Sequence, residues 1–176
     1  MDKLIIILGP TATGKTSIGV KIAHLFNGEI ISADSRQIYK RMDIGTGKDL
    51  NEYRINYSDI PYHLIDILSP YEDYSVFQFK KDFYNIFDKI NKKNKVPILC
   101  GGTGLYIESV LLNYNIPNIS PDYTLRSKLE KYDMQSLIKK LKKIDLSSYK
   151  EDYHITQRRI IRQIEISKSK KHKKII

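Results

Sequence analysis

The chain has little of what membrane, secreted or disulfide-linked proteins need. Cys100 is the only cysteine among 176 residues, which excludes an intrachain disulfide and a cysteine-rich zinc site. It has no run of about 18 apolar residues that could cross a membrane, and its N-terminus lacks the pattern of a secretion signal. These absences predict a cytoplasmic protein with no membrane partner. Cys100 ends an apolar segment and is expected to be a small core residue.

Most of the chain has no net charge. The net charge is +10, yet residues 1–125 carry equal numbers of acidic and basic side chains, so the whole excess lies in residues 126–176. A length of 176 residues allows one good core with a small extension. A neutral core with a basic extension suggests that the extension meets a polyanion, nucleic acid being the usual one. The alternative is a solvated, lysine-rich helix surface.

The most specific single motif is a phosphate-binding loop. Residues 9–16 read GPTATGKT behind the apolar residues 4–8, which fits the pattern G-x-x-x-x-G-K-[ST]. Its glycines let backbone N–H groups face phosphate oxygens, its lysine supplies a positive charge, and its threonine offers a hydroxyl to Mg²⁺. A helical pattern follows, with apolar residues Ile18, Ile22, Leu25 and Phe26. The expected phosphate-binding residues are Gly9, Pro10, Thr11, Ala12, Thr13, Gly14, Lys15 and Thr16, with Mg²⁺ at Thr16.

Three short apolar segments predict an α/β fold with a parallel sheet. Residues 4–8, 29–32 and 96–100 are expected to be buried strands separated by helical patterns. The phosphate loop behind the first strand makes this a P-loop NTPase-like core. Residues 75–93 predict the clearest helix, with a capping box of Ser75 and Gln78 at its start. Its apolar stripe consists of Val76, Phe79, Phe83, Ile86, Phe87 and Ile90.

Two stretches depart from this pattern. Residues 43–74 contain Gly45, Gly47, Pro61 and Pro70 with little periodicity, which predicts a long irregular connection at the site. Beyond residue 116, basic helices are expected at residues 125–132, 135–144 and 155–167. The predicted domains are the front half of a catalytic core at residues 1–116, a helical basic insertion or extension at 117–167, and a frayed lysine-rich tail at 168–176.

Polar residues follow the second and third predicted strands. Asp34 lies at the edge of the sheet where such folds bind ligands, and is a candidate general base or metal-sphere residue. The alternative is that Asp34 caps the next helix together with Ser35. Residues 101–104 read GGTG and bring backbone N–H groups and the Thr103 hydroxyl to the same edge. We expect the two strand ends to converge on one site.

Four segments together resemble the tRNA dimethylallyltransferases, which prenylate an adenosine beside the anticodon. The segments are GPTATGKT at residues 9–16, ISADSRQIYKRMDIGTGK at 31–48, PYHLIDILSPYEDYSVFQFKKD at 61–82 and VPILCGGTGLYIESVL at 96–111. The resemblance spans most of residues 3–112. It is specific, because shikimate and adenylate kinases share the phosphate loop but not the DSRQIYK and GGTGLYI elements.

The resemblance implies an enzyme that uses dimethylallyl diphosphate and Mg²⁺, with the phosphate loop holding a diphosphate leaving group. It implies that Asp34 is the base that accepts a proton from the adenine amine, with Thr103 as the second catalytic residue. The partner would be the anticodon stem-loop of a tRNA, whose target adenine leaves its stack. The implied tRNA-binding residues are Asp34, Ser35, Arg36, Gln37, Thr103, Arg126, Arg158, Arg159, Ile160, Ile161 and Arg162.

The last five of these residues match the start of a family helix. Arg158 and Arg162 are four residues apart on one helix face, which suits contact with phosphates. The alternative is an amphipathic helix with solvated arginines. Where the family usually has Asn-Asp before this helix, the chain has Ile155-Thr156, which removes a cap and a polar contact.

Members of the family generally continue well beyond the last residue of this sequence. The resemblance therefore implies the front half of the core and part of an inserted lobe. Three explanations stay open: another chain completes the protein, it is a reduced enzyme, or it is an inactive remnant that binds RNA and phosphate. Uncovered apolar surface would favour self-association.

Two other activities also stay open. Prenylation of free AMP or ATP uses the same chemistry, although the basic extension argues against it. A small-molecule kinase would share the phosphate loop but would leave the DSRQIY and GGTG elements unexplained.

Overall fold

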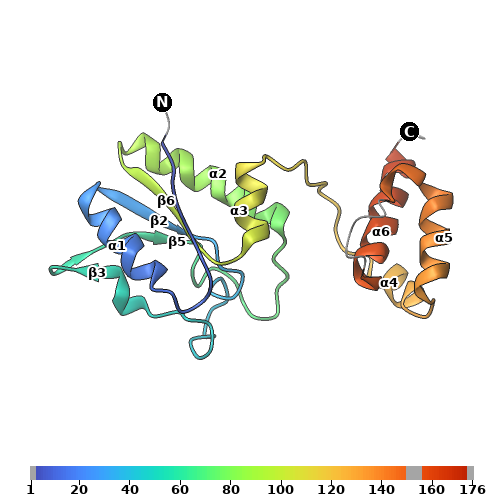
Figure 1. Ribbon diagram of the computed structural model, residues 1–176, viewed down its shortest axis with the longest axis horizontal. Helices are drawn as coiled ribbons and strands as arrows, with labels where there is room; N and C mark the ends of the chain where they lie inside the picture. The colour runs from blue at the N-terminus through green and yellow to red at the C-terminus, as the bar shows by residue number, and fades with distance from the viewer. Residues whose placement is uncertain (1–2, 150–155, 174–176) are drawn as a thin grey trace. The chain divides into compact units, whose positions relative to one another are not determined.

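The computed structural model describes residues 3–149 and 156–173 (Figure 1). Residues 1–116 form one compact unit and residues 117–176 another. Within the part of the chain that is described, no helix is both long enough and apolar enough to cross a membrane.

The first unit is built on a four-stranded parallel sheet with the strand order β1-β6-β2-β5. The three predicted strands are confirmed as β1 (Ile5–Leu8), β2 (Gly28–Ser32) and β6 (Val96–Gly101). In the register of the two central strands, Ser32 lies opposite Cys100. The carboxyl ends of β2 and β6 therefore come to the same edge of the sheet.

The prediction that residues 43–74 form a long irregular connection is wrong in part. They contribute the fourth strand, β5 (Tyr62–His63), a 3₁₀ helix η1 (Leu50–Tyr53), and an antiparallel pair of β3 (Arg54–Ile55) and β4 (Ser58–Asp59). These elements escape a periodicity search because each strand has only two residues. Tyr62 pairs with Ile30, so tertiary contact with β2 decides that β5 is a strand.

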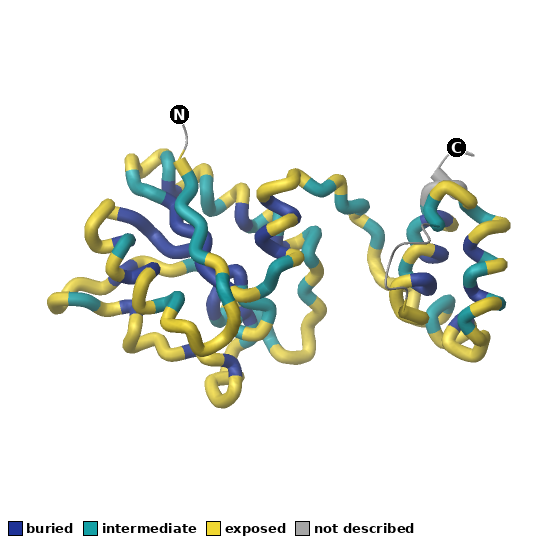
Figure 2. The backbone as a smooth tube through the Cα atoms, viewed as in Figure 1, coloured by how far each residue is buried: buried dark blue, intermediate teal, exposed yellow. Residues whose placement is uncertain are grey.

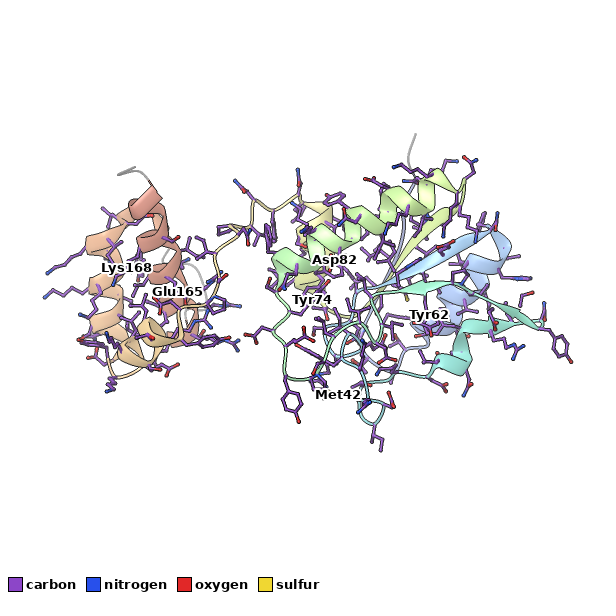
Figure 3. The ribbon with its side chains drawn as sticks, turned by 180° about the vertical axis from the view of Figure 1, so that it is seen from behind. Met42, Tyr62, Tyr74, Asp82, Glu165 and Lys168 are labelled. Carbon is purple, nitrogen blue, oxygen red and sulfur yellow. The ribbon has the colours of Figure 1, made fainter. Side chains whose placement is uncertain are left out.

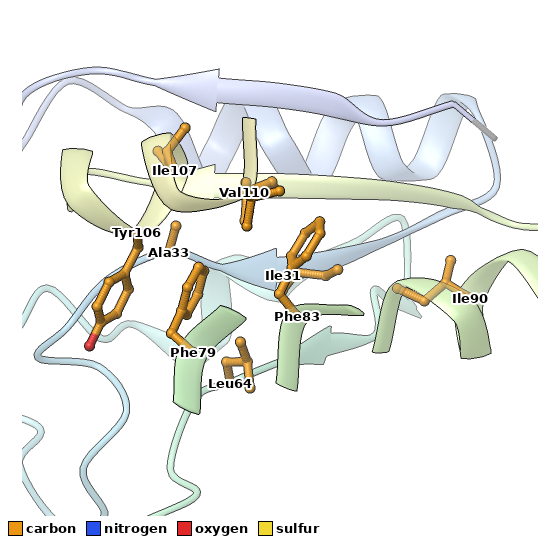
Figure 4. Close-up of a cluster of buried hydrophobic side chains, with 10 residues drawn as sticks. Ile31, Ala33, Leu64, Phe79, Phe83, Ile90, Tyr106, Ile107 and Val110 are labelled. Carbon is orange, nitrogen blue, oxygen red and sulfur yellow. The ribbon is translucent and has the colours of Figure 1, made fainter. Parts of the chain in front are cut away.

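Helices cover both faces of the sheet, with α1 (Lys15–Leu25) on one side and α2 (Val76–Lys92) and α3 (Gly104–Leu111) on the other (Figure 1). Successive residues of a strand point to opposite faces. Ile30 and Ile98 accordingly pack in the cluster with α1, while Ile31 packs with α2 and α3 (Figure 4). Burial on both faces explains why Ile30 and Ile31 are apolar neighbours in β2 and why β6 has an apolar run.

The predicted helix at residues 75–93 is confirmed as α2. Ser75 and Gln78 form the capping box, and Phe79, Phe83 and Ile90 are buried in the core (Figure 4). The stacked rings of Phe79 and Tyr106, with centroids 4.2 Å apart, join α2 to α3. The aromatic stripe thus fixes both helices on one face of the sheet.

The helix predicted after the phosphate loop is confirmed as α1, but most of the apolar residues that indicated it do not form its buried side. Ile18, Leu25 and Phe26 are exposed, whereas Gly19, Val20 and Ala23 form the buried side of the helix. Small residues let α1 approach the sheet closely. A Cβ added at Gly19 would lie 3.4 Å from Cys100 Sγ and 3.5 Å from Ile7 Cδ1.

The second unit contains α4 (Tyr123–Leu129), α5 (Met134–Ile144), η2 (Leu146–Ser148) and α6 (Gln157–Lys173). The apolar faces of α4, α5 and α6 meet in one core, visible as buried stretches in Figure 2, formed by Leu129, Leu137, Leu141, Ile160, Ile161 and Ile164. α6 extends to Lys173, into the segment predicted to be a lysine-rich tail, which is consistent with lysine being a good helix former. Residues 174–176 and Ile155, where the last helix was expected to begin, lie outside the described residues.

Candidate active site

The phosphate loop connects β1 to α1 and is closed by its own side chains. Ala12 and Gly14 take left-handed backbone angles, with φ of 62° and 75°. Thr13 Oγ1 donates a hydrogen bond to the carbonyl of Pro10 at 2.8 Å, and Lys15 Nζ donates to the same carbonyl. Gly14 offers no side-chain cap to α1, so the N–H groups of the first turn are open to an anion.

The ends of β2 and β6 meet as the sequence predicts. The Thr103 N–H donates to the Ala33 carbonyl at 3.0 Å, and the Ser35 N–H donates to Thr103 Oγ1 at 3.0 Å. These two bonds join the turn that carries Asp34 to the turn that carries Thr103.

Asp34 caps a turn, not a helix. Its Oδ1 accepts a hydrogen bond from the Arg36 N–H at 2.8 Å, and no helix begins in residues 35–38. The alternative reading of Asp34 and Ser35 as a helix cap is therefore wrong. The bond holds one carboxylate oxygen in place. The Asp34 side chain is half-buried at the edge of the sheet.

One cleft of about 460 Å³ brings together part of the predicted site, and Ser35, Arg36 and Thr103 are not among its lining residues. Residues 11–16 of the phosphate loop, Asp34, Gln37 and the end of β6 line it, together with part of the segment that the sequence predicted to lie at the site as an irregular connection. That segment continues through a 3₁₀ helix to the buried Tyr53. The added lining residues are Asp43, Gly45, Thr46, Gly47, Lys48, Asp49, Glu52 and Tyr53.

We call residues 42–48 the glycine loop; it begins at Met42, labelled in Figure 3. Lys48 at its end has a side chain only 1% exposed and donates to the Tyr39 carbonyl at 2.9 Å, to Asp43 at 2.9 Å and to Asp66 at 2.5 Å. Burial disfavours the charged ammonium, but the hydrogen bonds to Asp66 and Asp43 outweigh it and raise the pKa of Lys48. The family-like segment at residues 31–48 was the available signal, yet Asp66 is too distant in sequence to suggest this ion pair.

Cys100 lies in the core as predicted and also borders the cleft. Its thiol approaches the Lys15 carbonyl at 3.6 Å. Burial raises the pKa of Cys100 to about 11, with the nearby Lys15 charge opposing the shift. The thiol therefore stays protonated at neutral pH and is no nucleophile.

In the second unit, predicted RNA-binding arginines surround a buried carboxylate. Glu165, labelled in Figure 3, is 2% exposed and accepts bonds from Arg126 Nε at 2.8 Å, Arg126 Nη2 at 2.9 Å and Arg162 Nη1 at 2.7 Å. Burial acts to raise the pKa of Glu165, but the bonds from Arg126, Arg162 and the Asp122 N–H outweigh it and lower the pKa to about 2.

The side chains of residues 158–162 differ in how far they are exposed. Arg158 and Arg159 are exposed near the start of α6, whereas Ile160 and Ile161 are only 2% and 4% exposed. The two isoleucines therefore pack in the core of the second unit and are not placed for contact with RNA. Arg162 donates a further bond to the Ile119 carbonyl at 2.7 Å.

Within the residues that are described, no group of three or more His, Cys, Asp or Glu side chains could hold a metal ion. The chemistry of the loop fits a different kind of site. Mg²⁺ is commonly bound through one or two protein oxygens together with substrate phosphates and water. Thr16, half-buried in the first turn of α1, offers such an oxygen beside the phosphate loop.

Comparison with known proteins adds two family models. The model for IPP transferase matches residues 37–175 and the model for isopentenyl transferase matches residues 2–56. A tRNA dimethylallyltransferase of Azobacteroides pseudotrichonymphae is 54% identical over 168 residues, covering 93% of this chain and 53% of the relative. One of Phocaeicola vulgatus is 47% identical, covering 96% of this chain and 55% of the relative. The chain thus spans about half the length of these relatives.

The solved structures that the chain resembles belong to proteins named for the same activity. The tRNA isopentenylpyrophosphate transferase of Bacillus halodurans superposes with a TM-score of 0.62 at 39% identity, over 96% of this chain and 56% of that protein. A eukaryotic dimethylallyltransferase acting on tRNA gives a TM-score of 0.75 at 30% identity, over 94% of this chain and 41% of that protein. These neighbours share the P-loop NTPase-like α/β fold. The chain therefore belongs to the tRNA dimethylallyltransferase family, also called the IPP transferases.

Proposed function

We propose that this chain transfers a dimethylallyl group from dimethylallyl diphosphate to N6 of an adenosine 3′ to the anticodon of a tRNA, in the cytoplasm. The observation that carries the proposal is the single cleft shared by the phosphate loop and Asp34. A leaving-group site and a base must lie together for such a transfer. Relatives and structural neighbours named for this activity support the choice of substrates.

The donor's diphosphate binds at the phosphate loop. The Lys15 ammonium and the open N–H groups at the start of α1 stabilise the negative charge that grows on the diphosphate as the carbon–oxygen bond breaks. Mg²⁺, held by Thr16 and the diphosphate oxygens, would offset more of that charge. To bind diphosphate, Lys15 exchanges its bond to the Pro10 carbonyl for a bond to the ligand.

Asp34 acts on the acceptor. As N6 of adenine forms its bond to the prenyl carbon, the Asp34 carboxylate accepts the proton that the nitrogen loses. The Arg36 N–H holds Oδ1 at 2.8 Å, so Oδ2 is the oxygen assigned to this proton. Ser35, Gln37 and Thr103 lie beside Asp34 and are assigned to the target nucleotide, which must leave its stack to reach the carboxylate.

The second unit is assigned to the anticodon stem-loop. Arg158 and Arg159 present exposed cationic side chains at the start of α6, which suits contact with phosphates. Arg126 and Arg162 also remain candidates, held in fixed orientations by Glu165. Fixed guanidinium groups bind phosphate with less loss of entropy than mobile ones.

The test is to incubate the chain with dimethylallyl diphosphate, Mg²⁺ and an unmodified tRNA, and to measure prenyladenosine by mass spectrometry after nuclease digestion. We expect product from the wild type and about 10²–10⁴-fold less from Asp34→Asn. The full-length Bacillus halodurans relative serves as the positive control for the tRNA. No product from the chain at any concentration, while the relative modifies the same tRNA, would refute catalysis by this chain.

A second acceptor is kept because the isopentenyl transferase model matches residues 2–56, which contain the phosphate loop and Asp34. In this alternative the chain prenylates free AMP or ATP. Competition between mononucleotide and tRNA separates the two, since a tRNA enzyme keeps its rate in excess AMP. Salt-dependent tRNA binding without any product would instead indicate a non-catalytic binding protein. Phosphoryl transfer from labelled ATP would indicate a kinase.

Association with another chain is the last part of the proposal. Leu8, Leu25 and Leu112 of the first unit are 59%, 75% and 63% exposed, which leaves apolar surface in water. A second copy or a completing chain would cover it. Sedimentation at several concentrations tests for self-association, and a single monomeric species throughout would exclude it.

A further inference from the structure

We propose that Lys48 is a positioning residue that fixes the glycine loop as a wall of the cleft and, through Gln37, steadies the end of β2 that carries Asp34. The inference rests on the proposed function only for the identity of the ligand. It concerns a buried cation that the proposed mechanism does not use.

The Lys48 ammonium is fully occupied by protein. An ammonium has three N–H groups, and those of Lys48 have three acceptors: the Tyr39 carbonyl, Asp43 and Asp66. With a side chain only 1% exposed, Lys48 is not placed to bind a phosphate directly. The ammonium instead pairs with protein groups from separate segments of the chain.

The three acceptors lie on three different segments of the chain. Tyr39 follows β2, Asp66 follows β5, and Asp43 belongs to the glycine loop itself. The two outer segments also join through a parallel bridge between Tyr39 and Leu68. Lys48 therefore ties the glycine loop to a rigid base at the carboxyl edge of the sheet.

A second chain of hydrogen bonds runs from the loop to the site. Gln37 Nε2 donates to the Gly47 carbonyl at 3.1 Å, and Gln37 Oε1 accepts from Ser32 Oγ at 3.1 Å. Ser32 is the last residue of β2, two positions before Asp34. Displacement of the glycine loop is thus transmitted to the backbone that orients the proposed base.

The loop needs such an anchor because its own backbone is permissive. Gly45 and Gly47 have positive φ values of 77° and 65°, with nothing within 4 Å of an added Cβ at either position. The internal bond from Thr46 Oγ1 to the Met42 carbonyl, at 2.7 Å, closes the turn but does not attach it to the sheet. Lys48 provides that attachment.

Loss of Lys48 should release the loop without unfolding the core. Asp43 is 70% exposed and Asp66 is 32% exposed, so both carboxylates can turn to water when the ammonium is removed. Neither belongs to the apolar clusters of the first unit. Lys48→Met keeps the length of the stem and removes only the charge and its hydrogen bonds.

The first experiment uses inorganic pyrophosphate with Mg²⁺ as the probe and calorimetry as the readout. We expect Lys48→Met to bind pyrophosphate at least about tenfold more weakly than wild type. Lys89→Met, which removes one exposed lysine of α2, is the matched control and should bind as wild type does. Equal affinities for the two variants would overturn the inference.

The second experiment separates positioning from a general loss of stability. Amide hydrogen exchange should accelerate in residues 42–48 of Lys48→Met while the core strands β2 and β6 keep their protection. If Lys48→Met does not fold, Asp43→Asn must show the same local acceleration, and unchanged exchange there refutes the proposal. These readouts need no turnover, so weaker pyrophosphate binding without any prenylation by wild type would support Lys48 and reject the proposed function.

Discussion

Thr103 accepts a hydrogen bond from the Ser35 backbone N–H at 3.0 Å, through a side chain 68 positions away in sequence. The bond makes the turn after β6 a support for the turn after β2, where Asp34 lies. Thr103 thus has a structural task at the site beside any contact with substrate.

Replacing Thr103 with valine tests how much the hydrogen bond from the Ser35 N–H stabilises the site. Thr103→Val keeps the shape of the side chain but leaves the Ser35 N–H without its acceptor, at a cost of about 1–3 kcal/mol in the free energy of unfolding. Urea unfolding measures the cost, and hydrogen exchange at the Ser35 amide should accelerate. Thr103→Ser retains the hydroxyl and should restore protection; equal exchange in wild type and Thr103→Val would contradict the prediction.

Gly101, the last residue of β6, has no room for a side chain. A Cβ there would lie 2.3 Å from the Ala33 carbonyl oxygen, which is backbone and cannot move aside freely. Gly101→Ala should destabilise the chain by about 1–3 kcal/mol or more through this overlap. Gly104→Ala is the control, because nothing lies within 4 Å of its added Cβ. Thermal unfolding should separate the variants, and matching midpoints would disprove the clash.

The stability of the second unit should fall in acid because of Glu165. Its pKa is about 2 in the folded chain against 4.5 for the unperturbed group. A lowered carboxyl pKa stabilises the fold at pH values above 4.5, and that contribution disappears as the pH falls from 4.5 toward 2. Urea unfolding of wild type between pH 7 and pH 3 should show this loss.

Glu165→Gln isolates that effect from other carboxylates, since the pKa of Glu29 is also lowered to about 2 where His63, Lys95 and Lys93 together outweigh its burial. The variant should lose roughly 3 kcal/mol at pH 7, as buried ion pairs do when one partner is removed. The difference from wild type should narrow in acid. A difference that does not depend on pH would show that Glu165 acts by packing alone.

The exposed arginines of α6 and the partly buried Arg162 should respond differently in tRNA binding. Arg158→Gln and Arg159→Gln remove exposed charges, and each should lower the slope of log affinity against log salt by about one if the residue binds a phosphate. Arg162→Gln also breaks bonds to Glu165 and Ile119, so it should reduce stability as well as affinity. Unchanged salt slopes in both exposed variants would remove α6 from the proposed tRNA surface.

Much of the first unit could be predicted because its signals are local. The phosphate loop, the capping box of Ser75 and Gln78, and the apolar central strands each follow from neighbouring residues. The elements that escaped prediction depend on distant partners. β5 is a strand because Tyr62 and His63 pair with β2, and the buried side of α1 is set by small residues that fit the sheet.

The candidate site likewise has some features that follow from local sequence and others that depend on distant contacts. By itself the sequence determined the phosphate loop, the carboxylate Asp34 and the location of the basic charge, because residue type and local spacing are sufficient for each. Only the tertiary structure decided that Lys48 pairs with Asp66, that Thr103 supports Ser35, and that Glu165 is buried between two arginines. The Lys48–Asp66, Arg126–Glu165 and Ser35–Thr103 contacts join residues 18, 39 and 68 positions apart, which only the packing of the elements brings together, so no local sequence pattern predicts them.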